Sequence, residues 1–311
     1  MILLSIGDQV EPGDYALHSR FNRAVNFTNG RRLVFLVDET IGAGPLSIVL
    51  KDLRTARNTS YLHVRPHAVA FGNQQFQFTG NQYYDSRLKF DRWKSSRFQR
   101  NVAVLREQIS VAAPPRSLAF LIDRRCGGDF KPGFEKSWAG QIACGVDRVF
   151  QGNLLSGIDT LKGCGWGLTP GGDDFIAGLL FGLDLLERLH EWDFQKIKDT
   201  IFKTAVGSNL FSNTFLDLAR RGLYFGKMKD LVMALVQGGE DSVRTSAKKL
   251  FTLGSTSGAD VATGFLMTVE AEDGRVSQWA ERAKEMDRSC LLPSSNSLAQ
   301  PVVVETEAGI S

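Results

Sequence analysis

The segment Gly163-Cys-Gly-Trp-Gly-Leu-Thr-Pro-Gly-Gly-Asp-Asp-Phe-Ile-Ala-Gly178 determines how this chain is organised. Five glycines fall in its first ten residues, Thr169-Pro170 stiffens the middle, and Asp173 and Asp174 open a strongly apolar helix. Glycines let the backbone adopt positive φ and approach a ligand closely. A helix start offers unpaired N–H donors and a partial positive charge. The segment therefore predicts a loop–helix unit that holds an anion or a carbonyl oxygen.

The two aspartates leave three interpretations open. A bare phosphate would be repelled by them, so a cation such as Mg²⁺ bridges carboxylate and substrate, or an aspartate accepts hydrogen bonds from substrate N–H groups. In the third interpretation, both aspartates only cap the helix and tether the loop. The spacing matches neither the Walker A motif nor the dinucleotide-binding fingerprint.

A second segment, Gly254 to Leu266, repeats the pattern at a constant offset of 86 residues. Gly172, Asp174 and Gly178 correspond to Gly258, Asp260 and Gly264. We therefore expect two related loop–helix units whose N-termini converge on one site. Chance recurrence of a good helix-capping pattern is the alternative. The candidate catalytic residues are Asp173, Asp174 and Asp260; the candidate substrate-binding residues are Gly165, Gly167, Thr169, Gly171, Gly172, Ser255, Thr256, Ser257, Gly258 and His18. No metal ligands are assigned, although Mg²⁺ remains possible as a cofactor.

The sequence on either side of these segments predicts an α+β fold, with a β-rich N-terminal domain and a mainly helical C-terminal domain. Residues 1–90 read as strands and turns, with a two-residue hairpin turn at Asn29-Gly30. Helical spacing begins near residue 98, residues 123–134 read as a linker, and seven helices are expected from residue 143 onward, the first over 143–156. We expect domains at 1–90 and 91–285, followed by a polar tail at 286–311.

Composition excludes several classes of protein. The 311 residues include 37 Lys and Arg against 34 Asp and Glu, a net charge of +3 with no concentrated basic run, so no nucleic-acid partner is expected. The longest apolar run, Phe175 to Leu183, is too short to cross a bilayer, so no membrane association is expected. Four cysteines without a C-x-x-C pair, and a start without a basic signal-peptide region, favour a cytoplasmic protein.

The residues Gly163 to Gly178 resemble the signature G-x-G-x-G-L-T-P-x-G-D-D-F-x-x-G of the AllH-like family, which is linked to a subunit of oxamate carbamoyltransferase. Ser255-Thr-Ser-Gly-Ala-Asp260 is similar to the second conserved block of that family. His18 to Asn26 and Gly42 to Ile48 are similar to its first. These blocks together span most of the chain, through about residue 270.

The resemblance implies one component of a transferase complex in purine and allantoin nitrogen catabolism. Such a complex would move a carbamoyl group between carbamoyl phosphate and an amide such as oxamate, with other protein subunits as partners and a small anionic amide or phosphate as substrate. Two other functions stay open on the residues alone. One is a Mg²⁺-dependent phosphotransferase or nucleotide-binding enzyme that uses the aspartate pair, and the other is a non-catalytic scaffold subunit whose glycine loops pack helices.

Overall fold

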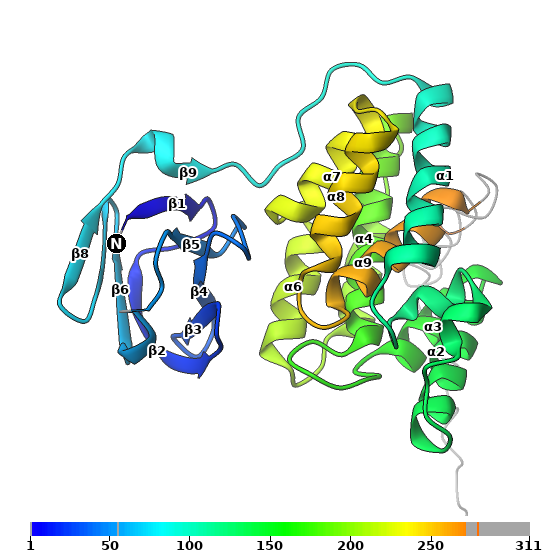
Figure 1. The fold of residues 1–311 in the computed structure, drawn as a ribbon, viewed down its shortest axis with the longest axis horizontal. Coiled ribbons are helices and arrows are strands. Elements are labelled where there is room, and N and C mark those ends of the chain that lie inside the picture. Colours follow the sequence, from blue (N-terminus) through cyan, green and yellow to red (C-terminus); the bar gives the residue numbers. More distant parts are fainter. Residues whose placement is uncertain (1, 55, 272–278, 280–311) are drawn as a thin grey trace, which may run out of the picture.

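The computed structural model describes residues 2–54, 56–271 and 279, and it has a curled nine-stranded sheet followed by helices. The α+β fold class is confirmed (Figure 1). The strands are β1 (Leu3–Gly7), β2 (Gly13–Arg20), β3 (Ala24–Thr28), β4 (Leu33–Asp38), β5 (Ser47–Leu50), β6 (Tyr61–Arg65), β7 (Ala68–Phe71), β8 (Gln74–Gln77) and β9 (Tyr83–Tyr84). Their order across the sheet is β8-β7-β6-β2-β3-β4-β5-β1-β9. Only the β4–β5 and β1–β9 pairs are parallel among these described strands.

The hairpin predicted around Asn29-Gly30 joins β3 to β4, but its turn is longer than expected. Thr28 pairs with Leu33, so four residues rather than two connect the strands. The Asn29 side-chain oxygen accepts hydrogen bonds from the backbone N–H groups of Arg31 and Arg32 at 3.1 and 2.9 Å. This local bonding closes the wider turn, with Gly30 at φ +86°.

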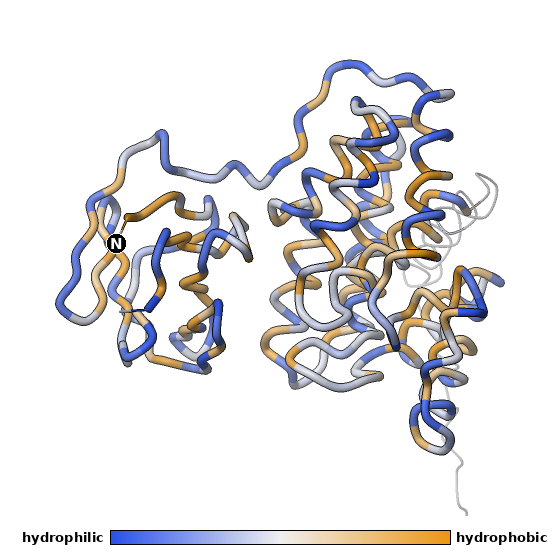
Figure 2. The backbone as a smooth tube through the Cα atoms, viewed as in Figure 1, coloured by the Kyte–Doolittle hydropathy of each residue, from blue (hydrophilic) through white to orange (hydrophobic). Residues whose placement is uncertain are grey.

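Strand β4 is buried on both of its faces, which explains its unbroken apolar sequence. Val34 and Leu36 point into the core enclosed by the sheet. Leu33, Phe35 and Val37 point the other way and pack with Phe211 of the helical part. Strand β4 therefore packs against the helices as well as into the sheet's own core, and Figure 2 shows apolar stretches in both parts.

Nine α-helices follow within the described residues: α1 (Ser95–Ala112), α2 (Phe134–Phe150), α3 (Leu154–Leu161), α4 (Gly171–His190), α5 (Gln195–Ala205), α6 (Leu210–Arg220), α7 (Gly226–Gln237), α8 (Glu240–Phe251) and α9 (Ser257–Glu270). The helix expected over 143–156 was wrong, because it merges two helices. Trp138, Ile142 and Val149 form one buried face that starts α2 earlier. Gly152, at φ +94°, then separates α2 from α3.

Hydrogen bonds also join the sheet region to the helices. The N–H of Gly226, at the start of α7, donates to the Ala43 carbonyl at 2.7 Å, and the N–H of Tyr224 donates to the Ser86 carbonyl at 2.8 Å. Within the described ranges, no helix is long and apolar enough to cross a membrane. The expected domain limits remain predictions, and the tail expected at 286–311 lies outside the described residues.

Candidate functional site

The two loop–helix units have the same backbone hydrogen bonding. In the first, the N–H of Cys164 donates to the Leu161 carbonyl and the N–H of Gly172 donates to the Cys164 carbonyl, both at 2.9 Å. In the second, Leu253 N–H donates to the Leu250 carbonyl at 2.9 Å and Gly258 N–H to the Leu253 carbonyl at 3.0 Å. The two units are therefore alike in structure as well as in sequence. The N–H groups of Gly172 and Gly258 donate to carbonyl oxygens of the chain itself, so they are not free to bind an anion.

Helices α4 and α9 cross with their backbones in contact, and matched glycines make this possible. A Cβ on Gly178 would lie 2.1 Å from the Val261 carbonyl oxygen. A Cβ on Gly264 would lie 2.1 Å from the Phe175 carbonyl oxygen. A glycine of each helix therefore lies against a backbone carbonyl of the other. Other contacts advance along both helices together: a Cβ on Gly171 would lie 3.3 Å from an Asp260 carboxylate oxygen, and one on Gly182 would lie 2.7 Å from the Thr268 Cβ. The two helices therefore run in the same direction, and both N-termini lie at one end.

Each of the three candidate aspartates is buried and hydrogen-bonded, and each has a different partner. Asp173 accepts from the N–H of Gly163 at 2.7 Å, and so tethers the glycine loop to α4. Neither Asp173 nor Asp174 caps its own helix, since α4 begins after Pro170 without a side-chain cap. The capping part of the third interpretation was therefore wrong, because the glycine loop takes up the Asp173 carboxylate, whereas the tether to the loop is confirmed for Asp173.

Asp174 and Asp260 lie beneath hydroxyl groups contributed by both loops. Asp174 accepts from the Thr169 hydroxyl at 3.1 Å and also bonds the Ser257 hydroxyl, which belongs to the other unit. Asp260 accepts from the backbone N–H of Leu118 at 2.7 Å and bonds the Thr256 hydroxyl. The two units thus share one hydrogen-bonded network at their common end.

Burial raises the pKa of both carboxyls. The pKa of Asp174 is raised well above its ordinary value by loss of solvent and then by the nearby charge of Asp260. Burial raises the pKa of Asp260 to about 7, against opposing hydrogen bonds from Leu118 and Thr256. Within the described chain, no group of three or more His, Cys, Asp or Glu side chains is placed to hold a metal ion. Because both pKa values are raised, the network is suited to holding a proton.

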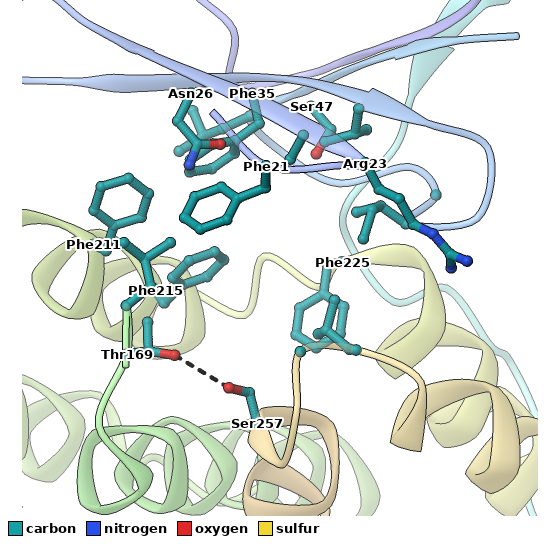
Figure 3. A pocket seen from close by; sticks show the side chains of 18 of the residues that line it. Phe21, Arg23, Asn26, Phe35, Ser47, Thr169, Phe211, Phe215, Phe225 and Ser257 are labelled. Atoms are coloured by element: carbon teal, nitrogen blue, oxygen red, sulfur yellow. Dashed lines mark hydrogen bonds between the residues drawn. The ribbon is translucent and has the colours of Figure 1, made fainter. Parts of the chain in front are cut away.

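A cavity of about 420 Å³ lies above this network, between the sheet and the helices (Figure 3). It is lined by residues of the two glycine loops, of helix α6, of the segment 21–26 and of the segment 41–47, together with single residues nearby. Thr169 and Ser257 lie on one side, with their hydroxyl oxygens 3.4 Å apart. Asn26, Phe35 and Ser47 of the sheet lie on the opposite side (Figure 3).

The predicted site residues divide into two groups around this cavity. Those that line it are Gly167, Thr169, Ser255, Thr256 and Ser257. Those outside the lining are Gly165, Gly171, Gly172, Gly258, Asp173, Asp174, Asp260 and His18. The glycines outside the lining serve close packing: a Cβ on Gly172 would lie 2.0 Å from the Leu161 carbonyl oxygen.

His18 lies on the exposed side of β2 rather than in the cavity wall. Its Nδ1 is 3.1 Å from the Ser19 hydroxyl, and the edge of its ring contacts Phe211, with ring centroids 4.9 Å apart. Phe211 itself lines the cavity. His18 therefore reaches the cavity only through an intervening side chain.

Sequence reasoning did not assign the aromatic wall of the cavity. Phe211 and Phe215 come from α6, while Phe21 and Phe35 come from the sheet region. Phe211 and Phe215 lie on an amphipathic helix, where such spacing is typical of core packing. Phe21 and Asn26 do fall inside the block His18 to Asn26, so that block was the available signal for the sheet side of the cavity.

Two loop glycines are expected to respond differently to substitution. Gly165 has φ +134°, and a Cβ there would lie 2.7 Å from the backbone nitrogen of Gly171. We expect Gly165→Ala to lower the free energy of unfolding by about 3 kcal/mol, because both strain and steric overlap oppose it. Gly163→Ala is the matched control, since Gly163 has φ +65° with open space around it. Its cost should be about 1 kcal/mol. Urea unfolding measures both, and equal losses would contradict the close contact at Gly165.

One of the comparisons with known proteins found a match, and it lies in the helical region. No curated protein and no solved structure matches the chain. The family model described as oxamate carbamoyltransferase subunit AllH matches residues 161–269, a stretch that begins at the end of α3 and includes both glycine loops, α4 and nearly all of α9. The resemblance suggested by the glycine-rich signature is therefore confirmed, and over residues 161–269 this chain is AllH-like. The similarity stated for His18 to Asn26 and Gly42 to Ile48 lies outside the matched residues and stays a prediction.

Proposed function

We propose that this protein is a cytoplasmic subunit of a carbamoyltransferase that moves a carbamoyl group between carbamoyl phosphate and an amide such as oxamate, in purine or allantoin nitrogen catabolism. One observation carries the proposal: the matched residues 161–269 include both loops that contribute hydroxyl groups to the cavity. The family name also supports other protein subunits as partners. The free thiols of Cys126, Cys144 and Cys164 fit a reducing compartment.

The polar side of the cavity is suited to the chemistry of an amide. Transfer breaks the bond between the carbamoyl carbon and a phosphate oxygen and forms a bond from that carbon to the acceptor nitrogen, which loses a proton. The Asp174 carboxyl lies behind the hydroxyls of Thr169 and Ser257, which bond it and line the cavity. The Asp174 carboxyl can pass this proton on while it is itself protonated, since one of its oxygens accepts a proton as the other releases one toward the leaving phosphate. Positioning by the loops supplies much of the remaining catalysis.

Asp174→Asn tests this assignment. We expect turnover to fall on the order of 100-fold, because the amide cannot accept the proton that the hydroxyls pass on. The measurement is carbamoylation of oxamate by the complex recovered with this chain, using carbamoyl phosphate as donor. Circular dichroism should show unchanged helicity, since asparagine keeps one oxygen for the Thr169 hydroxyl.

Asp159→Asn is the matched control, because the Asp159 side chain is 72% exposed on α3 in the same region. Its turnover should equal that of the wild type. Unchanged turnover in Asp174→Asn would reject the role of Asp174. A complex that carries out no carbamoyl transfer with wild-type chain would reject the proposed function itself.

A further inference from the structure

The cavity has an aromatic side that a two-carbon amide does not need. Phe35 and Phe215 lie with parallel ring planes and centroids 5.9 Å apart, and Phe211 lies 5.9 Å from Phe35. Phe35 and Phe211 are buried, whereas Phe21 at the edge of the cavity is half exposed. Figure 3 shows Phe211 and Phe215 beside Thr169, with Phe21 above them. Flat aromatic walls of this kind favour a flat, apolar ligand group.

Next to Phe215, the wall of the cavity offers a hydrogen-bond donor and an acceptor side by side. The hydroxyls of Thr169 and Ser257 both bond the single carboxyl of Asp174. When that carboxyl is protonated, it donates to one hydroxyl and accepts from the other. One hydroxyl then has a free O–H and the other a free lone pair. Their mutual contact of 3.4 Å is long for an O–H···O bond, so a ligand can replace it.

A carboxamide matches this arrangement, because it carries a C=O acceptor beside an N–H donor. A carboxylate does not match, since it offers acceptors only. The charged residues around the cavity also favour an amide over a carboxylate. Among the described residues that line the cavity, Arg23 is the one cation, and it is exposed at the edge. A neutral ligand is therefore favoured over a dianion at this position.

The size of the cavity agrees with a ligand larger than oxamate. Its volume of about 420 Å³ falls within the range of about 300–1,000 Å³ that is common for sites of drug-sized ligands. We propose that the cavity binds a primary carboxamide with a flat apolar group, its amide edge on Thr169 and Ser257 and its flat face against Phe35, Phe211 and Phe215. This proposal rests on the proposed function in placing the carbamoyl acceptor in this cavity.

Isothermal titration of the complex at pH 7 with benzamide, benzoate and oxamate tests the proposal. Benzamide should bind at least 10-fold more tightly than benzoate, which shares the ring but lacks the N–H groups. Phe215→Ala should weaken benzamide at least 10-fold and leave oxamate unchanged. Thr169→Val should weaken both amides at least 10-fold, and Thr169→Ser, which keeps the hydroxyl, should restore them.

The outcomes separate this proposal from the proposed function. Carbamoyl transfer to oxamate without any benzamide binding would overturn the ligand class and leave the transferase assignment standing. Benzamide binding that requires Phe215 and Thr169, in a complex without carbamoyl transfer, would support the ligand class and reject the transferase. Equal binding of benzamide and benzoate would overturn the role given to the hydroxyl pair.

Discussion

Gly264→Ala is expected to lower the free energy of unfolding by about 3 kcal/mol or more. The added Cβ would lie 2.1 Å from the carbonyl oxygen of Phe175 and 2.9 Å from its carbonyl carbon. Both are backbone atoms of α4, so no side-chain rotation relieves the overlap. The helices must separate, and the buried contact along α4 and α9 is lost with them. Alanine alone favours a helix over glycine by about 1 kcal/mol, so the expected sign depends entirely on this contact.

Gly140→Ala is the matched control for that prediction. Gly140 is an exposed residue within α2, and a Cβ there meets no heavy atom within 4 Å. This variant should be more stable than wild type by about 0.5–1 kcal/mol. Urea unfolding followed by circular dichroism measures both variants. A Gly264→Ala protein as stable as Gly140→Ala would show that α4 and α9 do not touch through their backbones.

The sequence predicted the parts of the molecule whose signal is local. Helix α4 follows from an apolar run entered through Gly-Gly-Asp-Asp, and α9 repeats that pattern. Strand β4 follows from five consecutive apolar residues, Leu33 to Val37, beside a turn. In each case one segment contains both the residues that favour the element and those that end it.

What the sequence did not predict depends on partners far along the chain. The N–H that Asp260 accepts belongs to Leu118, 142 residues away. The carbonyl groups of Cys164 and Leu253 take up the N–H groups of Gly172 and Gly258, which sequence reasoning had expected to hold an anion. Nothing in the spacing of a glycine motif reveals such competition. The aromatic wall was missed for a related reason, because phenylalanines at helical spacing look the same whether they face a core or a cavity.

Asp260→Asn should change how stability depends on pH. Burial raises the pKa of Asp260 in the folded chain to about 7, from 3.8 for an ordinary carboxyl. Below pH 4 both states hold the proton. Between pH 4 and 7 the unfolded chain releases it and the folded chain does not, so the folded state loses stability as pH rises. The difference amounts to about 4 kcal/mol above pH 7. Asparagine has no such proton to release. The free energy of unfolding of the variant, relative to that of the wild type, should therefore rise by about 4 kcal/mol between pH 4 and pH 7.

The comparison requires the variant to keep the contact that aspartate makes. The side-chain oxygen of asparagine can still accept the Leu118 N–H, so the two proteins should differ mainly in ionisation. Urea unfolding at pH 4.5, 6, 7.5 and 8.5 gives the difference at each pH. Asp241→Asn is the control, because Asp241 is fully exposed and should show the same difference from wild type throughout. If the difference in unfolding free energy between Asp260→Asn and wild type is also independent of pH, this carboxyl is already ionised at low pH. The buried network would then hold a charge rather than a proton.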